Sequence, residues 1–151
     1  MNDDPIIEYA PHYHSQIIDV IGRSLRDQKV VPDSDEPLED DDLRHIAENY
    51  AGRGRFWVCL AGETVIGTVA IREIDVSTAC LKCMFVVTAR HGQGIGQQLL
   101  DHALQFARAQ GYRVIVLDTH QLMKRAHRFY ERNGFMRVAD GNETYGYRMD
   151  L

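Results

Sequence analysis

The chain has 151 residues, of which 44% are hydrophobic and 26% charged, and this suits one globular domain over residues 1–151. Its 17 Lys and Arg stand against 22 Asp and Glu, so the formal charge is −5 and a chain-wide basic footprint for nucleic acid is absent. No apolar run approaches the roughly 20 residues of a membrane-spanning helix, and the first five residues lack the layout of a signal peptide. We therefore expect a cytoplasmic monomer or homodimer with no nucleic-acid or membrane partner.

The three cysteines, Cys59, Cys80 and Cys83, are an odd number in a chain without an export signal, which argues against a disulfide framework. Cys80 and Cys83 have the spacing of a redox or zinc pair, but they lie in an apolar run at residues 80–87 that is typical of a strand. Residues three apart on a strand point to opposite faces. We therefore expect packed thiols and no metal, since most of the histidines also lack metal-ligand spacing.

The first third of the chain predicts an edge strand followed by helices. Residues 5–9 are typical of an edge strand, and apolar residues then recur every fourth position from Tyr13 to Leu25, as on one face of a helix. Residues 33–42 contain seven acids and no base, which indicates a solvated loop. Its last acids are suited to cap a short helix at 43–50.

The middle of the chain predicts three strands. Residues 56–60 and 64–71 are expected to pair in an antiparallel manner across a tight turn at 61–63. Residues 80–87 predict the third strand.

The last third predicts a strand–helix–strand unit that closes on a hairpin. Helical spacing at 95–107 is followed by a continuous apolar run at 114–117, which is typical of a strand inside a sheet. A strand, a helix and a second strand in this order form a parallel pair. Another helix is expected at 122–133, and residues 135–138 and 145–149 predict the hairpin. The fold class is therefore α/β, with one mixed sheet and flanking helices.

Residues 91–96, His-Gly-Gln-Gly-Ile-Gly, lie between a predicted strand and a predicted helix. Glycines allow close approach of a ligand, and the first N–H groups of a helix have no internal acceptor, so this segment is suited to bind a phosphate. A Walker A loop needs Lys where Gln97 stands, and a dinucleotide fingerprint begun at Gly92 needs Gly at the same position. The alternative is that the glycines only form a tight turn.

Two segments together resemble the GNAT superfamily of acyl-CoA N-acyltransferases. The first is a pattern like V-x-P-x-x-R/Q-G-x-G-x-G/A, matched in outline by residues 86–96. The second resembles A-x-x-F-Y-x-x-x-G-F. It is met by Ala126, Phe129, Tyr130, Gly134 and Phe135. The resemblance covers residues 56–138 well.

The resemblance implies a central pair of parallel strands that splay apart around acetyl-CoA. The pantetheine arm is then expected on the backbone of Phe85, Val86 and Val87, with the thioester between the strands that end near Val87 and Leu117. The pyrophosphate is expected on the loop residues His91, Gly92, Gln93, Gly94, Ile95 and Gly96. The acetyl group would pass directly to a small-molecule or peptide amine.

Four positions depart from the family pattern. His91 stands where Arg or Gln is usual, and a neutral imidazole offers less to a pyrophosphate than a guanidinium does; the neighbouring Arg90 is a candidate to compensate. Thr88 replaces a common Pro, Met123 replaces an Asn that often contacts the coenzyme, and Cys80 begins a strand where some relatives carry a catalytic Glu. The backbone amides of the loop are unaffected, and we expect them to dominate pyrophosphate binding.

For the chemistry, Tyr130 matches the family position of the acid that protonates the leaving sulfur. Its alternative role is that of an amphipathic Tyr with its hydroxyl at the wet edge of a helix. We expect Glu73, just past the strand at 64–71, as the base, although it also fits an ordinary exposed acid. His120 is a second candidate base.

The acceptor amine is not identified by any motif. Outside residues 33–42, the chain has 17 bases and 15 acids and suits an anionic coenzyme, so the acidity is local to that run. Because loops near the first helices line the acceptor site in this superfamily, the run favours a cationic acceptor. Two other functions remain open: a catalytically silent coenzyme A binding or sensing module, and an interaction domain whose glycines only form a turn.

Overall fold

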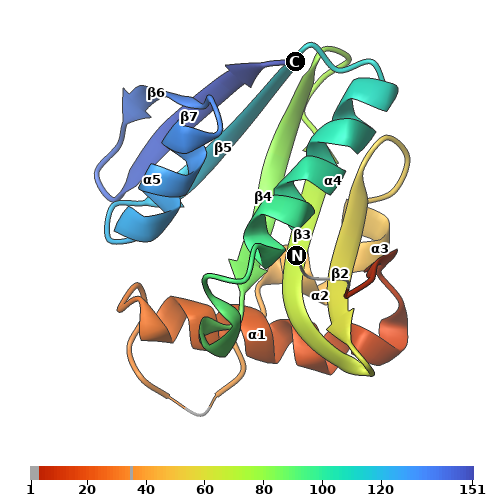
Figure 1. Cartoon of the computed structure of the whole chain (residues 1–151), viewed down its shortest axis with the longest axis vertical. Helices are drawn as coiled ribbons and strands as arrows, with labels where there is room; N and C mark the ends of the chain where they lie inside the picture. Colours follow the sequence, from red (N-terminus) through yellow and green to blue (C-terminus); the bar gives the residue numbers. More distant parts are fainter. Residues whose placement is uncertain (1–3, 35) are drawn as a thin grey trace.

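The computed structural model describes residues 4–34 and 36–151, and a seven-stranded mixed sheet forms its centre (Figure 1). The strands are β1 (Ile6–Glu8), β2 (Arg55–Ala61), β3 (Thr64–Glu73), β4 (Thr78–Val86), β5 (Val114–His120), β6 (Met136–Asp140) and β7 (Thr144–Asp150). Their order across the sheet is β1-β2-β3-β4-β5-β7-β6. β4 and β5 run parallel, and the other neighbouring pairs of described strands run antiparallel. This mixed α/β class confirms the prediction.

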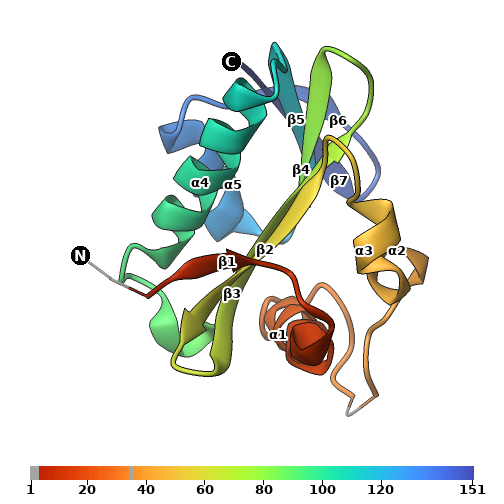
Figure 2. The ribbon, with the colours of Figure 1, turned by 90° about the vertical axis from the view of Figure 1, so that its right-hand side faces the viewer.

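Helices cover both faces of the sheet (Figure 2). They are α1 (His14–Asp27), α2 (Asp41–Arg44), α3 (Ile46–Asn49), α4 (Ile95–Ala109) and α5 (Lys124–Arg132), with short 3-10 turns η1 (Pro11–Tyr13) and η2 (Thr88–Arg90). The helices α4 and α5 lie on one face, and α1, α2 and α3 lie on the other. Among the helices of the described residues, none combines the length and the apolar character needed to cross a bilayer.

The parallel pair at the centre of the sheet is short. Its Cα partners run from Thr78 and Val114 to Cys80 and Val116. Beyond these residues the two strands diverge, and β5 continues with β7 and β6 as a separate wing (Figure 1). The predicted splayed pair is thus formed, and its open end lies at the carboxyl ends of β4 and β5.

A bulge in β4 lies next to this divergence. Thr68 of β3 pairs with Phe85, whereas Ala70 pairs with Lys82, so two residues of β4 face one residue of β3. Cys83, at the bulge, has a φ of 53°, and its carbonyl accepts a hydrogen bond of 2.6 Å from the Thr68 hydroxyl. A bulge bends its strand and re-aims the side chains beyond it.

Two apolar cores, one on each face, hold the helices on the sheet. On the α4 face, Leu99 and Leu100 are completely buried, and each such side chain stabilises the fold by roughly 1.5–3 kcal/mol. Gly67 of β3 allows this helix to approach, because a Cβ there would lie 2.8 Å from Cδ1 of Leu99. On the opposite face, Ile17 of α1 and Ile46 of α3 are buried against the sheet.

The acidic run and the short helix after it differ in detail from the prediction. The expected helix at 43–50 forms as α2 and α3, because His45 leaves helical geometry with a φ of −128° and a ψ of 53°. α2 begins two residues early, since the Asp40 side chain accepts a 3.0 Å hydrogen bond from the Leu43 amide and caps it. Asp35 of the run lies outside the described residues.

Candidate active site

The glycine loop exposes the N-terminus of α4. Gly92 and Gly94 have φ values of 81° and 82°, a left-handed conformation that costs other residues roughly 1–2 kcal/mol. Gly94 is the N-cap of α4, and no side chain caps the first turn. The first amides of the helix can therefore bind an anion, as the sequence predicts.

A cavity of about 440 Å³ opens over this loop, and we call it the loop cavity. The predicted contact residues that line it are Phe85, Val86, His91, Gly92, Gly94, Ile95, Gly96 and Tyr130. Gln93 and Val87 do not line it. Val87 lines a different cavity beside α1, and its amide is bonded to the Ile66 carbonyl at 2.9 Å.

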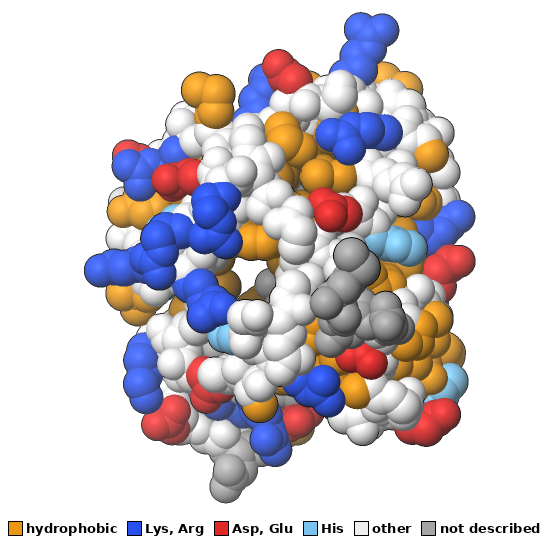
Figure 3. Space-filling view, in the orientation of Figure 1, with side chains coloured by type: hydrophobic (Ala, Val, Ile, Leu, Met, Phe, Trp, Pro, Cys, Tyr) orange, Lys and Arg blue, Asp and Glu red, His pale blue; other side chains and the backbone are white. Residues whose placement is uncertain are grey.

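Arginines form one wall of the loop cavity. Arg125, Arg128 and Arg132 line it from α5, and Arg90 lines it from η2. The spacing of the three α5 residues places them on one face of that helix. Figure 3 shows Lys and Arg side chains gathered beside a hollow on this side of the molecule. The positive charge suits a ligand with several phosphates.

The end of β4 offers a backbone contact toward the gap between the strands. Because the Val87 amide is bonded to β3, alternation directs the N–H and C=O of Val86 away from β3. Nε2 of His91 donates to the Val86 carbonyl at 2.9 Å. That carbonyl retains a second lone pair for an extended ligand. His91 therefore contacts the strand end, whereas the resemblance implies a contact with the pyrophosphate.

A second cavity, of about 280 Å³, lies between the diverging strands, and we call it the gap cavity. Four residues line both cavities: Met84, Phe85, Met123 and Tyr130. The two cavities therefore meet where β4 and β5 separate. A ligand in the loop cavity can present its reactive end to a second ligand in the gap cavity.

Tyr130 lies at this junction. Its side chain is 6% exposed, and its ring packs against Phe129, Phe135 and Tyr147 at centroid distances of 5.5, 5.5 and 6.2 Å. Its hydroxyl forms no hydrogen bond with another described residue. Burial raises the pKa of Tyr130, so the hydroxyl keeps its proton at neutral pH and can donate it to a ligand.

The structure does not bring Glu73 to this junction. β3 runs antiparallel to β4, so Glu73 pairs with Ala79 near the start of β4, at the closed end of the parallel pair. Its carboxylate is 2.5 Å from Arg53, and it lines neither the loop cavity nor the gap cavity. This position gives no support to the expected contact of Glu73 with the acceptor cleft, and its role as the base stays a prediction.

His120 lines the gap cavity but is poorly arranged as a base. Its Nδ1 accepts a 3.1 Å hydrogen bond from the Leu122 amide. In the neutral ring the proton is then on Nε2, so the lone pair that a base needs is already occupied. The ring is better suited to donate a hydrogen bond into the cavity.

The cysteines of β4 lie together rather than on opposite faces. Cys80 and Cys83 both line the gap cavity, because the bulge breaks the strand alternation. Burial raises the pKa of both thiols, that of Cys83 to about 12, so they stay protonated and are poor nucleophiles. All three cysteines are free, and no cluster of three or more His, Cys, Asp or Glu within the described ranges could hold a metal.

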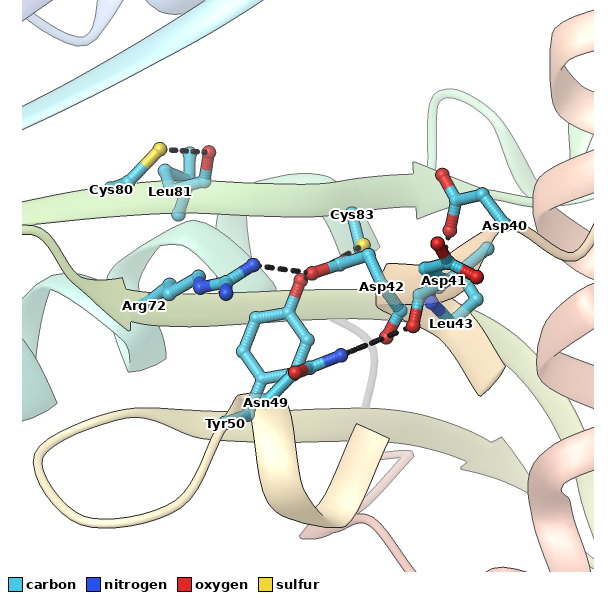
Figure 4. Close-up of polar contacts among 10 residues, drawn as sticks. All are labelled: Asp40, Asp41, Asp42, Leu43, Asn49, Tyr50, Arg72, Cys80, Leu81 and Cys83. Atoms are coloured by element: carbon cyan, nitrogen blue, oxygen red, sulfur yellow. Dashed lines mark hydrogen bonds and ion pairs between the residues drawn. The ribbon is translucent and has the colours of Figure 1, made fainter. Parts of the chain in front are cut away.

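The acidic run is occupied by local contacts (Figure 4). Asp40 caps α2, and Asp42 accepts hydrogen bonds from Arg72 at 2.7 Å and from the Tyr50 hydroxyl. None of the described residues of the run lines the gap cavity. The geometry therefore gives no support to the expected attraction of a cationic acceptor by this run.

Two groups of charged residues at the site were missed by sequence reasoning. The first is the arginine face of α5, formed by Arg125, Arg128 and Arg132. Their spacing of three and four residues in the sequence already indicates that they share one face of a helix. The second is the pair Lys82 and Asp118, which line the gap cavity from β4 and β5. No local pattern indicates that pair, because it depends on the divergence of the two strands.

Solved structures share this architecture over 97% or more of the chain. An acetyltransferase from Streptococcus agalactiae 2603 is 30% identical, with a TM-score of 0.87 and full coverage of both chains. A GNAT-family acetyltransferase from Staphylococcus aureus Mu50 is 26% identical, with a TM-score of 0.87 over 97% of this chain and 98% of that one. The PaiA N-acetyltransferase of Thermoplasma acidophilum, solved with coenzyme A, shares the fold at 18% identity, with a TM-score of 0.80 over 99% and 100% of the two chains.

Curated relatives match a shorter segment. Mouse probable N-acetyltransferase family 8 member 5 is 33% identical over 108 residues, which are 68% of this chain and 48% of that protein. Human N-acetyltransferase 8B is 35% identical over 104 residues, which are 64% of this chain and 46% of that protein. The chain thus spans about half the length of the curated relatives it matches.

The model of the acetyltransferase (GNAT) family matches residues 18–135, which include β4, the glycine loop and α5. The resemblance seen in the sequence is thereby confirmed. This chain belongs to the GNAT acetyltransferase family.

Proposed function

We propose that the chain is an N-acetyltransferase that moves an acetyl group from acetyl-CoA to a primary amine by direct attack. The observation that carries this proposal is the junction of the two cavities between β4 and β5, with Tyr130 in both linings. One cavity has the glycine loop and an arginine wall, which suit the phosphates of coenzyme A. The other has room for an acceptor. The coenzyme A bound to a neighbour of the same fold agrees with this assignment.

Acetyl-CoA would lie in the loop cavity with its pyrophosphate on the amides of Gly92, Gly94 and Ile95. The pantetheine arm would pair with the gap-facing backbone of Val86. The arginines of α5 would neutralise phosphate charge. Gln93 and Val87, expected from the resemblance, have no support from the cavity lining and are left out of this assignment.

In the reaction, the neutral amine nitrogen forms a bond to the thioester carbonyl carbon, and the C–S bond breaks. The nitrogen loses one proton to solvent, and the leaving sulfur takes one from the Tyr130 hydroxyl, which solvent then reprotonates. The products are an N-acetyl amine and the free thiol of coenzyme A. A covalent route through Cys80 or Cys83 is disfavoured, because both thiols stay protonated.

The experiment is a thiol-release assay with acetyl-CoA and a panel of amines: amino acids, polyamines, aminoglycosides and peptide N-termini. We expect turnover with at least one amine and none without protein. Calorimetry with coenzyme A runs beside it. Binding without turnover of any amine would favour the silent coenzyme A binding module, which the departures from the family pattern at Cys80, His91 and Met123 suggest. Neither binding nor turnover would favour the interaction domain.

Several expectations from the sequence stay predictions. These are the cytoplasmic location, the monomer or homodimer, the absence of nucleic-acid and membrane partners and the extent of one domain over residues 1–151.

A further inference from the structure

The gap cavity contains two charged side chains that the rest of the fold leaves without a partner. Lys82 lines it from β4, and Asp118 lines it from β5. Within residues 4–34 and 36–151, neither side chain forms a hydrogen bond or an ion pair. Nearby, Arg72 is already bound to Asp42 at 2.7 Å. One cation and one anion therefore face the cavity unneutralised.

The two charges lie on the same face of the sheet. Leu81 and Leu117 are buried in the core beneath α4, and strand alternation directs Lys82 and Asp118 to the opposite face. Each lies two residues beyond the last paired position, Cys80 with Val116. Because the strands diverge from there, the two side chains stand on opposite sides of the gap, with the cavity between them.

The remainder of the lining is largely apolar. The hydrophobic members of the lining are Leu25, Val30, Leu81, Met84, Phe85, Leu117 and Met123. The thiols of Cys80 and Cys83 are neutral. An acceptor that fits this cavity thus has one positive group, one negative group and an apolar body.

We propose that the acceptor is an amine that also bears a carboxylate, of the α-amino acid class with an apolar side chain. Lys82 binds the carboxylate, and Asp118 binds the ammonium group before it loses its proton. This inference rests on the proposed function, since it concerns the second substrate of the same site. It also replaces the cationic acceptor that the acidic run suggested.

The test measures acetylation by the full chain with matched amines that differ only in the carboxylate. Each set has an amino acid, its α-carboxamide and its decarboxylated amine, for example L-phenylalanine, L-phenylalaninamide and 2-phenylethylamine, with equivalent sets for leucine and methionine. We expect the kcat/KM of the amino acid to exceed that of both partners by about tenfold or more, the usual effect of one charge-assisted hydrogen bond.

Variants of Lys82 and Asp118 test which residue produces the preference for the carboxylate. Lys82→Met should raise the KM of the amino acid by about tenfold and leave the KM of the decarboxylated amine within about twofold, and Lys82→Arg should retain most of the preference. Lys124→Met, at an exposed lysine outside both cavities, should change neither. Asp118→Asn should raise the KM of all three amines alike, because all three share the ammonium group. An unchanged Kd for coenzyme A shows that each variant is folded.

Equal kcat/KM values within every set, or a Lys82→Met effect that is the same with and without a carboxylate, would overturn the inference. If coenzyme A binds but no amine is acetylated, the proposed function fails instead. Calorimetric titration of L-phenylalanine, L-leucine and L-methionine into the coenzyme A complex then decides the inference. Binding that Lys82→Met abolishes supports it, and no binding of any of the three overturns it.

Discussion

Replacing Tyr130 by Phe separates catalysis from packing, because the hydroxyl forms no hydrogen bond with the described residues while the ring is buried. Phe retains the ring contacts with Phe129, Phe135 and Tyr147. The free energy of unfolding should therefore change by less than about 0.5 kcal/mol. If the hydroxyl protonates the leaving sulfur, kcat should fall by about 100-fold or more, since general acids contribute roughly 10² to 10⁴.

Tyr147→Phe is the matched control on the neighbouring ring. The Tyr147 hydroxyl donates to the Glu131 carboxylate at 2.6 Å and lines neither cavity. Losing a hydrogen bond to a charged group should cost about 1.5 kcal/mol, which lowers the Tm of a chain of this size by about 3–6 °C. Its kcat should stay within about twofold of the parent.

The assays are thiol release at saturating acetyl-CoA, thermal unfolding and the Kd of coenzyme A for all three proteins. A kcat of Tyr130→Phe within about threefold of the parent would show that the hydroxyl does not protonate the leaving sulfur. A loss of stability in Tyr130→Phe as large as that in Tyr147→Phe would also contradict this role, since the loss of activity would then follow from the fold.

Three further predictions concern the coenzyme site and the buried thiol. Arg128→Ala should raise the Kd of coenzyme A several-fold at low salt, and the difference should shrink in 0.5 M salt, about where screening becomes strong; a salt-independent effect would contradict an electrostatic role. Gly94→Ala should weaken coenzyme A binding by about tenfold, because Ala strains the left-handed cap, and unchanged calorimetric affinity would contradict this. Cys83 should resist iodoacetamide at pH 8 and react faster as the pH rises toward its pKa of about 12. The thiol of the unfolded chain ionises near pH 8.5, whereas the folded Cys83 thiol does not, so the free energy of unfolding should fall as the pH rises above about 8.5. Rapid labelling of Cys83 in the folded protein at pH 8 would count against its burial.

The divergence of β4 and β5 explains why so few residues suffice for the proposed reaction. The strands pair with each other only as far as Cys80 and Val116, so beyond that point the backbone groups that face the gap have no neighbouring strand on that side. An extended ligand can take the place of a neighbouring strand there, and the thiols of Cys80 and Cys83 beside it remain neutral. The chemistry then depends on position at the junction rather than on a charged nucleophile.

Two expectations from the sequence differ from the structure because each treats one strand by itself. Glu73 was expected at the acceptor cleft because the resemblance implies acceptor contacts from the region after this strand, yet the antiparallel pairing of β3 with β4 places it at the closed end. Cys80 and Cys83 were expected on opposite faces, but the bulge brings both to one cavity. Each difference concerns how one strand lies against another.

The order of elements, the glycine turn and the position of Tyr130 on its helix could all be predicted from the sequence, because hydrophobic periodicity and glycine conformation are local properties of the chain. The acceptor cavity could not. Lys82 and Asp118 are 36 positions apart in the sequence and lie in one lining only because two strands separate after three paired residues. A bulge in β4 lies next to that separation, and the strand pairing and the bulge both depend on contacts between distant segments.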